Sequence, residues 1–279
     1  MDILVTTDWL SQQLGDPDLV VLECTVHTVM EDEGGFHNVS GRADYDLGHI
    51  PGSGFADLTT DLSDQTSPIE FAPPTPERFC AAMGQLGVGD DTRVVLYDRL
   101  MSAWAARVWW MLRWVGFDRA AILDGGLNVW SAEGHPLSLE PANHPVRHLT
   151  PAPRPELIAD RDEVIGAIEN NAVNIIDTLP EESYKGEQTM YARPGHIPGA
   201  VNISGMDLLD EQGRFRPMDE LDAMHEGDPS ARNITYCGGG ILASSNAFVM
   251  TRLGYTDVGV YTASLQEWAA DPANPLVVD

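Results

Sequence analysis

A five-residue motif occurs twice in this chain of 279 residues, and the repeat constrains the fold more than any other feature. Residues 48–52 and residues 195–199 both read Gly-His-Ile-Pro-Gly. The same landmarks then follow each copy in the same order. They are a strand-like run that ends in a tyrosine, a helical stretch that ends near a glycine, a tryptophan, and a Pro-Leu pair. This order predicts two copies of one structural unit.

The boundary between the copies is expected in a proline-rich stretch. Residues 138–156 contain five prolines, at positions 141, 145, 151, 153 and 155, and proline favours an extended, exposed chain. We therefore predict an N-terminal domain over residues 1–138, a linker over 139–156 and a C-terminal domain over 157–279.

Within each copy, short apolar runs alternate with helical stretches. Residues 19–22 and 173–177 are rich in β-branched side chains, whereas residues 161–170 have a helical pattern. This alternation predicts an α/β fold, a mostly parallel sheet flanked by helices on both faces. Ligands of such sheets bind at the carboxyl ends of strands. The residues that follow the runs ending in tyrosine are Asp98 and Cys237, so we expect the site there.

Cys237 begins a loop that has no packing rationale. Three glycines follow it, then Ile241 and Leu242, and a helix is expected from about Ala243. Glycines allow backbone N–H groups to converge, and such groups at a helix N-terminus stabilise negative charge on the sulfur. We therefore predict that Cys237 is an exposed, nucleophilic thiolate able to carry a second sulfur atom. Cys24 and Cys80 lie in apolar surroundings and are expected to be buried.

Charge and cysteine content exclude several classes of partner. The chain has 43 acidic and 16 basic side chains, for a net charge of −27, which disfavours nucleic acid and anionic membranes. No signal-peptide pattern is present at the N-terminus, and the most apolar stretch, residues 103–117, is interrupted by two arginines. The three cysteines have no disulfide or zinc spacing. We expect a cytoplasmic protein without a metal or other cofactor.

Taken together, these motifs resemble the two-domain rhodanese-type sulfurtransferases, the family of thiosulfate and 3-mercaptopyruvate sulfurtransferases. The resemblance extends over essentially the whole chain and includes Val-Trp-Trp at 108–110 and Leu-Asp-Gly-Gly-Leu at 123–127. It implies two tandem rhodanese-like domains, of which the first is inactive because Asp98 stands in place of the cysteine. In the second, Cys237 takes the outer sulfur of a small donor as a persulfide. The sulfur then passes to a thiophilic acceptor such as cyanide, a thiol or a thioredoxin-like protein.

The resemblance also assigns roles to other residues. Members of the mercaptopyruvate type carry two basic substrate-binding residues in the segment where this chain has Lys185 and Arg193, although the first of these is commonly an arginine. The backbone of residues Gly238, Gly239, Gly240, Ile241 and Leu242 is expected to contact the substrate. In the same type, a histidine at the place of His49 has been proposed as a proton relay. Because His196 repeats it, fixing a turn is the alternative role.

The identity of the donor rests on the residues after the cysteine. Thiosulfate-specialised members have basic residues there, whereas this chain has Gly238 and Gly239, which favours 3-mercaptopyruvate. Gly239 nevertheless replaces the serine that is common in the mercaptopyruvate type. Thiosulfate as donor, or a non-catalytic sulfur-carrier module, are the alternatives. A dual-specificity phosphatase is excluded, because its longer loop ends in an arginine and here the first basic residue after Cys237 is Arg252.

Overall fold

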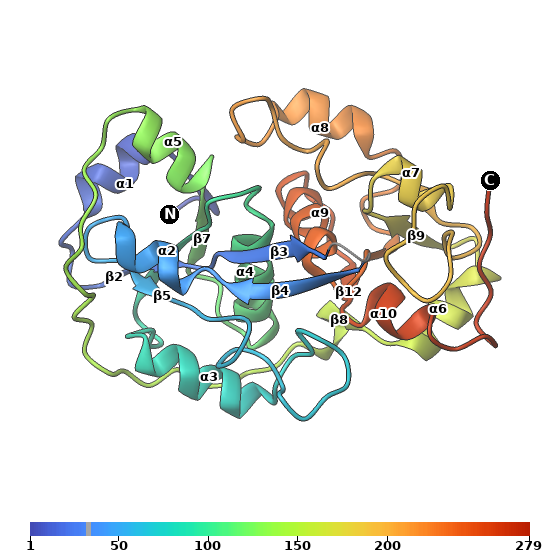
Figure 1. The fold of residues 1–279 in the computed structure, drawn as a ribbon, viewed down its shortest axis with the longest axis horizontal. Helices are drawn as coiled ribbons and strands as arrows, with labels where there is room; N and C mark the ends of the chain where they lie inside the picture. The colour runs from blue at the N-terminus through green and yellow to red at the C-terminus, as the bar shows by residue number, and fades with distance from the viewer. Residues whose placement is uncertain (32–34) are drawn as a thin grey trace. The chain divides into compact units, whose positions relative to one another are not determined.

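The computed structural model describes residues 1–31 and 35–279 (Figure 1). The chain divides into two compact units. Unit 1 comprises Met1–Gln65, Pro73–Arg154 and Glu211–Phe215, and unit 2 comprises Thr66–Ala72, Pro155–Asp210 and Arg216–Asp279. Each unit contains one five-stranded parallel sheet, so the predicted α/β fold with two similar domains is confirmed.

The sheet of unit 1 has the strand order β1-β7-β6-β2-β5, with all neighbours parallel. Its strands are β1 (Leu4–Val5), β2 (Leu19–Glu23), β5 (Gly54–Phe55), β6 (Arg93–Tyr97) and β7 (Ala120–Leu123). Its helices are α1 (Thr7–Gln13), α2 (Arg42–Leu47), α3 (Pro76–Gln85), α4 (Ala103–Trp114) and α5 (Gly126–Ala132).

The sheet of unit 2 has the order β10-β9-β11-β12-β8, again parallel throughout. Its strands are β8 (Ile158–Ala159), β9 (Val173–Asp177), β10 (Val201–Asn202), β11 (Arg232–Tyr236) and β12 (Val258–Tyr261). Its helices are α6 (Arg161–Ile168), α7 (Glu181–Tyr184), α8 (Met218–Met224), α9 (Ile241–Arg252) and α10 (Ser264–Trp268), with a 3₁₀ turn at Pro155–Leu157. Written from the other edge, β8-β12-β11-β9-β10, this order matches that of unit 1 strand for strand.

An antiparallel hairpin distinguishes the two units. Unit 1 contains β3 (Val26–Met30) paired with β4 (Phe36–Ser40) in the register Val26↔Ser40, and the pair is drawn in blue in Figure 1. Unit 2, which the structure describes completely, has no hairpin between its copies of the flanking strands β2 and β5. The sequence analysis did not predict this insertion, because its polar residues carry no strong strand pattern.

The central strands and the helix after each are covered on both faces. All five residues of β2 are buried, as are four of the five in β6. A sheet flanked by helices on both sides produces such continuous apolar strands. In α4, Trp109 and Trp110 are about 1% exposed, and the Trp109 indole N–H donates to the Ala120 carbonyl. The central strands of unit 1 and helix α4 are therefore buried within their own domain.

The proline-rich connector is extended but is packed against unit 1. The N–H groups of Arg147, Ala152 and Arg154 donate to backbone carbonyls at the ends of α3 and α4. At Gly116, where φ is +90°, an added Cβ would lie 2.6 Å from the Ala152 carbonyl oxygen. The chain changes unit between Arg154 and Pro155. The predicted connector is thus an extended strap that is bonded to the first unit as far as Arg154.

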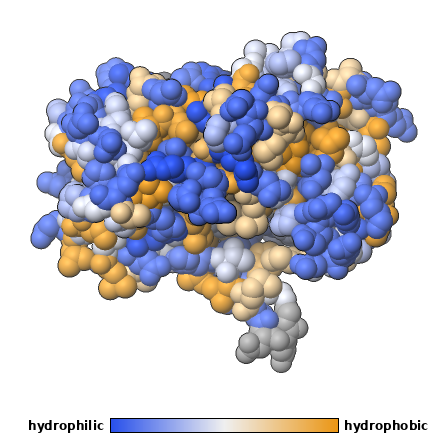
Figure 2. Space-filling view, turned by 90° about the horizontal axis from the view of Figure 1, so that it is seen from above, coloured by the Kyte–Doolittle hydropathy of each residue, from blue (hydrophilic) through white to orange (hydrophobic). Residues whose placement is uncertain are grey.

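Within the part of the chain that the structure describes, no helix is long and apolar enough to cross a membrane. Hydrophilic residues cover much of the face shown in Figure 2, with hydrophobic residues interspersed among them.

Candidate active site

Cys237 lies where the sequence places it, between a strand and a helix. It directly follows Tyr236, the last residue of β11, and α9 begins at Ile241 after Gly240, whose φ is +79°. The Gly240 N–H donates to the Cys237 sulfur at 3.1 Å. The side chain is only 3% exposed, so the expectation of an exposed thiol is wrong. The sulfur is held inside its loop, beside a backbone N–H at the start of a helix, where negative charge is favoured.

Helix α10 holds the cysteine loop from the other side. The N–H groups of Leu265 and Gln266 donate to the carbonyls of Cys237 and Gly238 at 3.1 and 3.0 Å. The Cys237 N–H in turn donates to the Ser264 hydroxyl oxygen at 3.1 Å. The first N–H groups of a helix have no partner within the helix, so α10 satisfies them on this loop. These bonds fix the backbone of the loop. They do not explain its glycines, which a further contact requires.

Tyr191 makes the contact that requires a glycine, and this role was not predicted from the sequence. A Cβ added to Gly238 would lie 1.4 Å from the Tyr191 hydroxyl oxygen and 2.3 Å from its Cζ. The phenol therefore packs directly on the loop, and only glycine fits beneath it. Burial raises the pKa of Tyr191, and the negative charges of Cys237, Asp177 and Glu70 add to the effect. Tyr191 is a neutral hydroxyl at the cysteine loop.

Asp177 and Tyr236 form the base of the site. They are register partners at the carboxyl ends of β9 and β11. Burial raises the pKa of Asp177 to about 6, against the opposing effect of hydrogen bonds from the Tyr236 hydroxyl and the Leu179 N–H. The Tyr236 hydroxyl also accepts from the Ile197 N–H at 2.9 Å. The second copy of the repeated motif is thus tied to the strand that carries the cysteine.

Arg193 is held by backbone carbonyls at the end of α10. Its Nε donates to the Ala269 carbonyl at 2.9 Å, and its Nη2 lies 2.7–3.1 Å from the carbonyl oxygens of Trp268, Asp271 and Asn274. These bonds cap the carboxyl end of the helix whose amino end holds the cysteine loop. Contact between Arg193 and a donor molecule stays a prediction, and it has to coexist with these bonds.

Lys185 lies at the surface of unit 2. Its ammonium group is 2.6 Å from the Glu181 carboxylate, which raises the pKa of the lysine, and its side chain is 40% exposed. Its carbonyl accepts from the N–H of Asp279. These contacts are to α7 and the last residue of the chain rather than to the cysteine loop. Its role in substrate binding stays a prediction.

The two histidines of the repeated motif have the same surroundings. His49 stacks on Tyr45 at 4.0 Å and His196 on Tyr184 at 3.7 Å. In each case Nδ1 is bonded to the carbonyl of that tyrosine, at 2.9 and 2.8 Å. Nε2 of His49 is bonded to a further carbonyl, that of Glu140. These contacts fix a turn in both units, and the relay role of His49 stays a prediction.

The matching loop of unit 1 is closed by its own carboxylate. Oδ1 of Asp98 accepts from the N–H groups of Leu100 and Ser102, and Oδ2 from those of Trp104 and Ala105, at 2.9–3.1 Å. Although this loop lacks glycines, its backbone N–H groups converge on the carboxylate. The left-handed position before the helix, φ +58°, is taken by Ser102. The converging N–H groups of unit 1 are therefore already occupied by its own carboxylate.

The other two thiols are buried, as predicted. Cys24 is fully buried and Cys80 is 2% exposed. Burial raises the pKa of Cys80 to about 12. It raises that of Cys24 well above its usual range, with the charges of Asp98 and Glu23 adding to the effect. Neither thiol can act as a thiolate without a change of structure.

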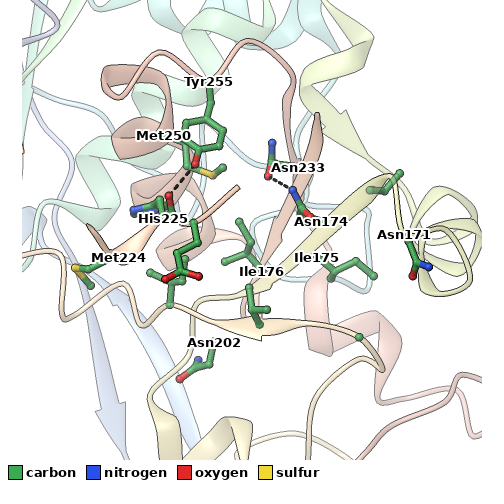
Figure 3. Close-up of a pocket in the computed structure, with 15 residues that line it drawn as sticks. Asn171, Asn174, Ile175, Ile176, Asn202, Met224, His225, Asn233, Met250 and Tyr255 are labelled. Carbon is green, nitrogen blue, oxygen red and sulfur yellow. Dashed lines mark hydrogen bonds between the residues drawn. The ribbon is translucent and has the colours of Figure 1, made fainter. Parts of the chain in front are cut away.

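A cavity of about 370 Å³ lies elsewhere in unit 2 (Figure 3). It runs along β9 and β10 and is lined in part by Asn174 and Asn233, which bond to each other at 3.0 Å near the amino ends of their strands. The described residues that line it do not include the cysteine loop. This cavity is therefore separate from the sulfur site.

Comparison with known proteins agrees with this geometry. The rhodanese-like domain family matches residues 6–133 and 160–271. A 3-mercaptopyruvate sulfurtransferase of Escherichia coli K12 is 33% identical over 276 residues, covering 95% of this chain and 94% of the relative. Thiosulfate sulfurtransferase of Rattus norvegicus is 31% identical over 278 residues, covering 95% and 91%.

A solved structure has the same fold. The crystal structure of SseA from Escherichia coli, described as having the rhodanese fold and the catalytic mechanism of 3-mercaptopyruvate sulfotransferases, superposes with a TM-score of 0.83 at 31% identity. The match covers 95% of this chain and 99% of that one. The chain therefore belongs to the rhodanese family and is a two-domain sulfurtransferase.

Proposed function

We propose that the chain transfers sulfur preferentially from 3-mercaptopyruvate, through a persulfide on Cys237. The observation that carries this proposal is the composition of the cysteine loop. Gly238, Gly239 and Gly240 offer backbone N–H groups and no cationic side chain, and the Gly240 N–H already faces the sulfur. A helix N-terminus supplies only about half a charge. That amount suits a donor whose carboxylate is bound at a distance from the sulfur better than it suits a compact dianion.

The cysteine loop carries the sulfur chemistry. The Cys237 thiolate attacks the sulfur of the donor, and the new S–S bond forms as the C–S bond breaks, so that pyruvate leaves as its enolate and takes up a proton. N–H groups arranged around the loop stabilise the negative sulfur of the persulfide, as an oxyanion hole stabilises oxygen. A thiophilic acceptor then removes the outer sulfur. We propose cyanide, small thiols or a thioredoxin-like protein as acceptors.

The carboxylate end of the donor is assigned to Arg193 and Lys185, and the backbone of residues 238–242 to its sulfur end. Each basic residue has to meet a condition. Arg193 must bind the donor without releasing the carbonyls at the end of α10, and Lys185 must exchange Glu181 for the donor. A relay through His49 requires one of its two carbonyl bonds to break.

Thiosulfate is the alternative donor, since relatives of similar identity carry either name. A cytoplasmic location also belongs to the proposal. All three cysteines are free thiols, which is consistent with a reducing compartment.

The test compares the two donors with cyanide as the common acceptor, at matched ionic strength. We expect a higher kcat/KM for 3-mercaptopyruvate. Thiosulfate turning over equally well or better would overturn the proposed preference. A rate equal to that of the Cys237→Ser variant with both donors would instead indicate a carrier module without turnover.

A further inference from the structure

The Tyr191 phenol packs where the absence of a side chain at Gly238 leaves room for it. Its hydroxyl oxygen would be 1.4 Å from a Cβ on Gly238, the residue directly after the catalytic cysteine. Any side chain at this position would displace the phenol. Because the φ of Gly238 is outside the left-handed region, the backbone itself does not demand glycine. The glycine is needed for the close approach of Tyr191.

Unit 1 shows what happens without this arrangement. There, the residue directly after Asp98 is Arg99, whose guanidinium pairs with the fully buried Glu23 and donates to the Gly48 carbonyl. A charged side chain thus occupies the corresponding position in the unit that lacks the cysteine. In unit 2 that position has no side chain, and a hydroxyl lies against it instead. The tyrosine hydroxyl therefore packs beside the residue that directly follows the cysteine.

We propose that the Tyr191 hydroxyl is the proton donor to the carbon fragment that leaves when Cys237 takes sulfur from 3-mercaptopyruvate. This inference rests on the proposed function, because the need for a proton depends on the donor. Breaking the C–S bond leaves its electron pair on pyruvate as an enolate, which must be protonated to become pyruvate. Thiosulfate instead releases sulfite, a stable anion that needs no proton at neutral pH.

The protons and electrons of the step balance without any further reagent. The Cys237 thiolate and the thiol form of the donor give Cys237–S–SH and the enolate of pyruvate. The two sulfur atoms are formally oxidised by one electron each, and the methylene carbon of the donor is reduced by two. Tyr191 gives its proton to the enolate and regains one from the S–H of the persulfide. The products are Cys237–S–S⁻ and pyruvate.

The surroundings of Tyr191 suit a donor that stays protonated until the step. Burial and the nearby charges of Cys237, Asp177 and Glu70 all raise the pKa of Tyr191, so the phenol does not ionise in the resting enzyme. Each of these groups opposes a tyrosinate, which therefore recovers its proton quickly. A positioned acid of this kind contributes roughly 10²–10⁴-fold to a rate.

The test is the Tyr191→Phe variant of the full chain, assayed with each donor and with cyanide as acceptor. Phenylalanine keeps the ring on Gly238 and removes only the oxygen. We expect kcat with 3-mercaptopyruvate to fall at least about 10²-fold, while kcat with thiosulfate changes less than about threefold. Tyr255→Phe is the matched control, since it also removes a buried hydroxyl, one bonded to the His225 carbonyl at 3.0 Å, and we expect both donors to be unaffected.

The outcomes separate this inference from the proposed function. If Tyr191→Phe loses activity equally with both donors, Tyr191 only positions the loop and the inference is wrong. It is equally wrong if neither donor is affected. If the wild-type chain does not use 3-mercaptopyruvate at all, the proposed function is wrong and the proton-donor role of Tyr191 is wrong with it, a result that differs from a selective lack of effect in Tyr191→Phe.

Discussion

The Asp98 carboxylate occupies the same position in the loop of unit 1 as the Cys237 sulfur does in the loop of unit 2. Both residues directly follow a buried tyrosine at the carboxyl end of a central strand. Asp98 accepts four backbone N–H bonds, whereas the cysteine sulfur accepts one, from Gly240. The loop of unit 1 is also one residue longer, since α4 begins five residues after Asp98 and α9 four after Cys237. In unit 1 the loop is occupied by its own carboxyl group, whereas in unit 2 it surrounds a thiol.

Replacement of Asp98 by cysteine should therefore destabilise unit 1 without creating a second site. Four N–H groups lose a carboxylate acceptor, and a single sulfur cannot meet all of them. We expect Asp98→Cys to cost on the order of 3 kcal/mol of unfolding free energy, measured by denaturant unfolding. Combined with Cys237→Ser, it should give no turnover with either donor. Robust activity of this double variant would show that the Asp98 loop of unit 1 can hold a reactive sulfur.

Loss of the Cys237 thiol alone should abolish sulfur transfer and leave the fold intact. In Cys237→Ser, the hydroxyl can accept the same N–H from Gly240, so we expect a stability change below about 1 kcal/mol. Mass spectrometry of the wild-type protein after treatment with a donor should find one added sulfur atom, on Cys237. Cys24→Ser and Cys80→Ser serve as controls. A persulfide on either of those two residues would contradict the assignment.

The architecture could be predicted from the sequence because a repeat carries its own internal check. Two copies of Gly-His-Ile-Pro-Gly and the matching strands predicted two similar α/β units with mostly parallel sheets, and Cys237 followed from its three glycines. The hairpin β3–β4 was missed because it belongs to one copy only. The strap at 139–154 was missed because backbone bonds between distant segments leave no pattern in side chains.

The site was only partly predictable, for a related reason. The packing of Tyr191 on Gly238 joins residues 47 positions apart, and only the unexplained need for glycine hinted at it. The bonds from Arg193 end on carbonyls, which every residue possesses, so the sequence could not show them. The burial of Cys237 is likewise a result of how α10 closes the loop.

The contact between Tyr191 and Gly238 can be tested by overfilling it. Gly238→Ala should lower the unfolding free energy by about 1–3 kcal/mol, the usual cost of an added group in a packed site. Adding Tyr191→Ala should recover much of that loss in a double-mutant cycle. Gly166→Ala is the control, because its Cβ meets nothing within 4 Å. Additive effects of the two changes would show that the two residues are not in contact.

Removal of the Arg193 guanidinium should act on stability as well as on catalysis. Four carbonyls at the end of α10 lose their donor, so we expect Arg193→Ala to lower the melting temperature by several degrees. Arg216→Ala, which removes an exposed pair with Glu220 and a single bond to the Asp207 carbonyl, should change it less. An unchanged melting temperature together with a raised KM for 3-mercaptopyruvate would assign Arg193 to substrate binding alone.

Asp177 should make the stability of the protein depend on pH in a predictable direction. Burial raises the pKa of this carboxyl from 3.8 to about 6, so between these values the folded state keeps a proton that the unfolded state releases. Its contribution therefore makes folding less favourable as pH rises from about 4 to about 6. Above that range the penalty is constant, at roughly 3 kcal/mol.

Asp177→Asn removes this penalty, because an amide does not titrate and its oxygen can still accept from the Leu179 N–H. We expect the melting temperature of the variant to exceed that of the wild type by several degrees at pH 7 and above. The difference should shrink as pH falls toward 4, since the folded wild-type carboxyl is then neutral and the unfolded one is close to its own pKa of 3.8 and gains little from ionising. Taking the difference between the two proteins cancels the titration of the many other carboxylates. A difference that is independent of pH would show that Asp177 ionises in the folded protein as it does in the unfolded chain.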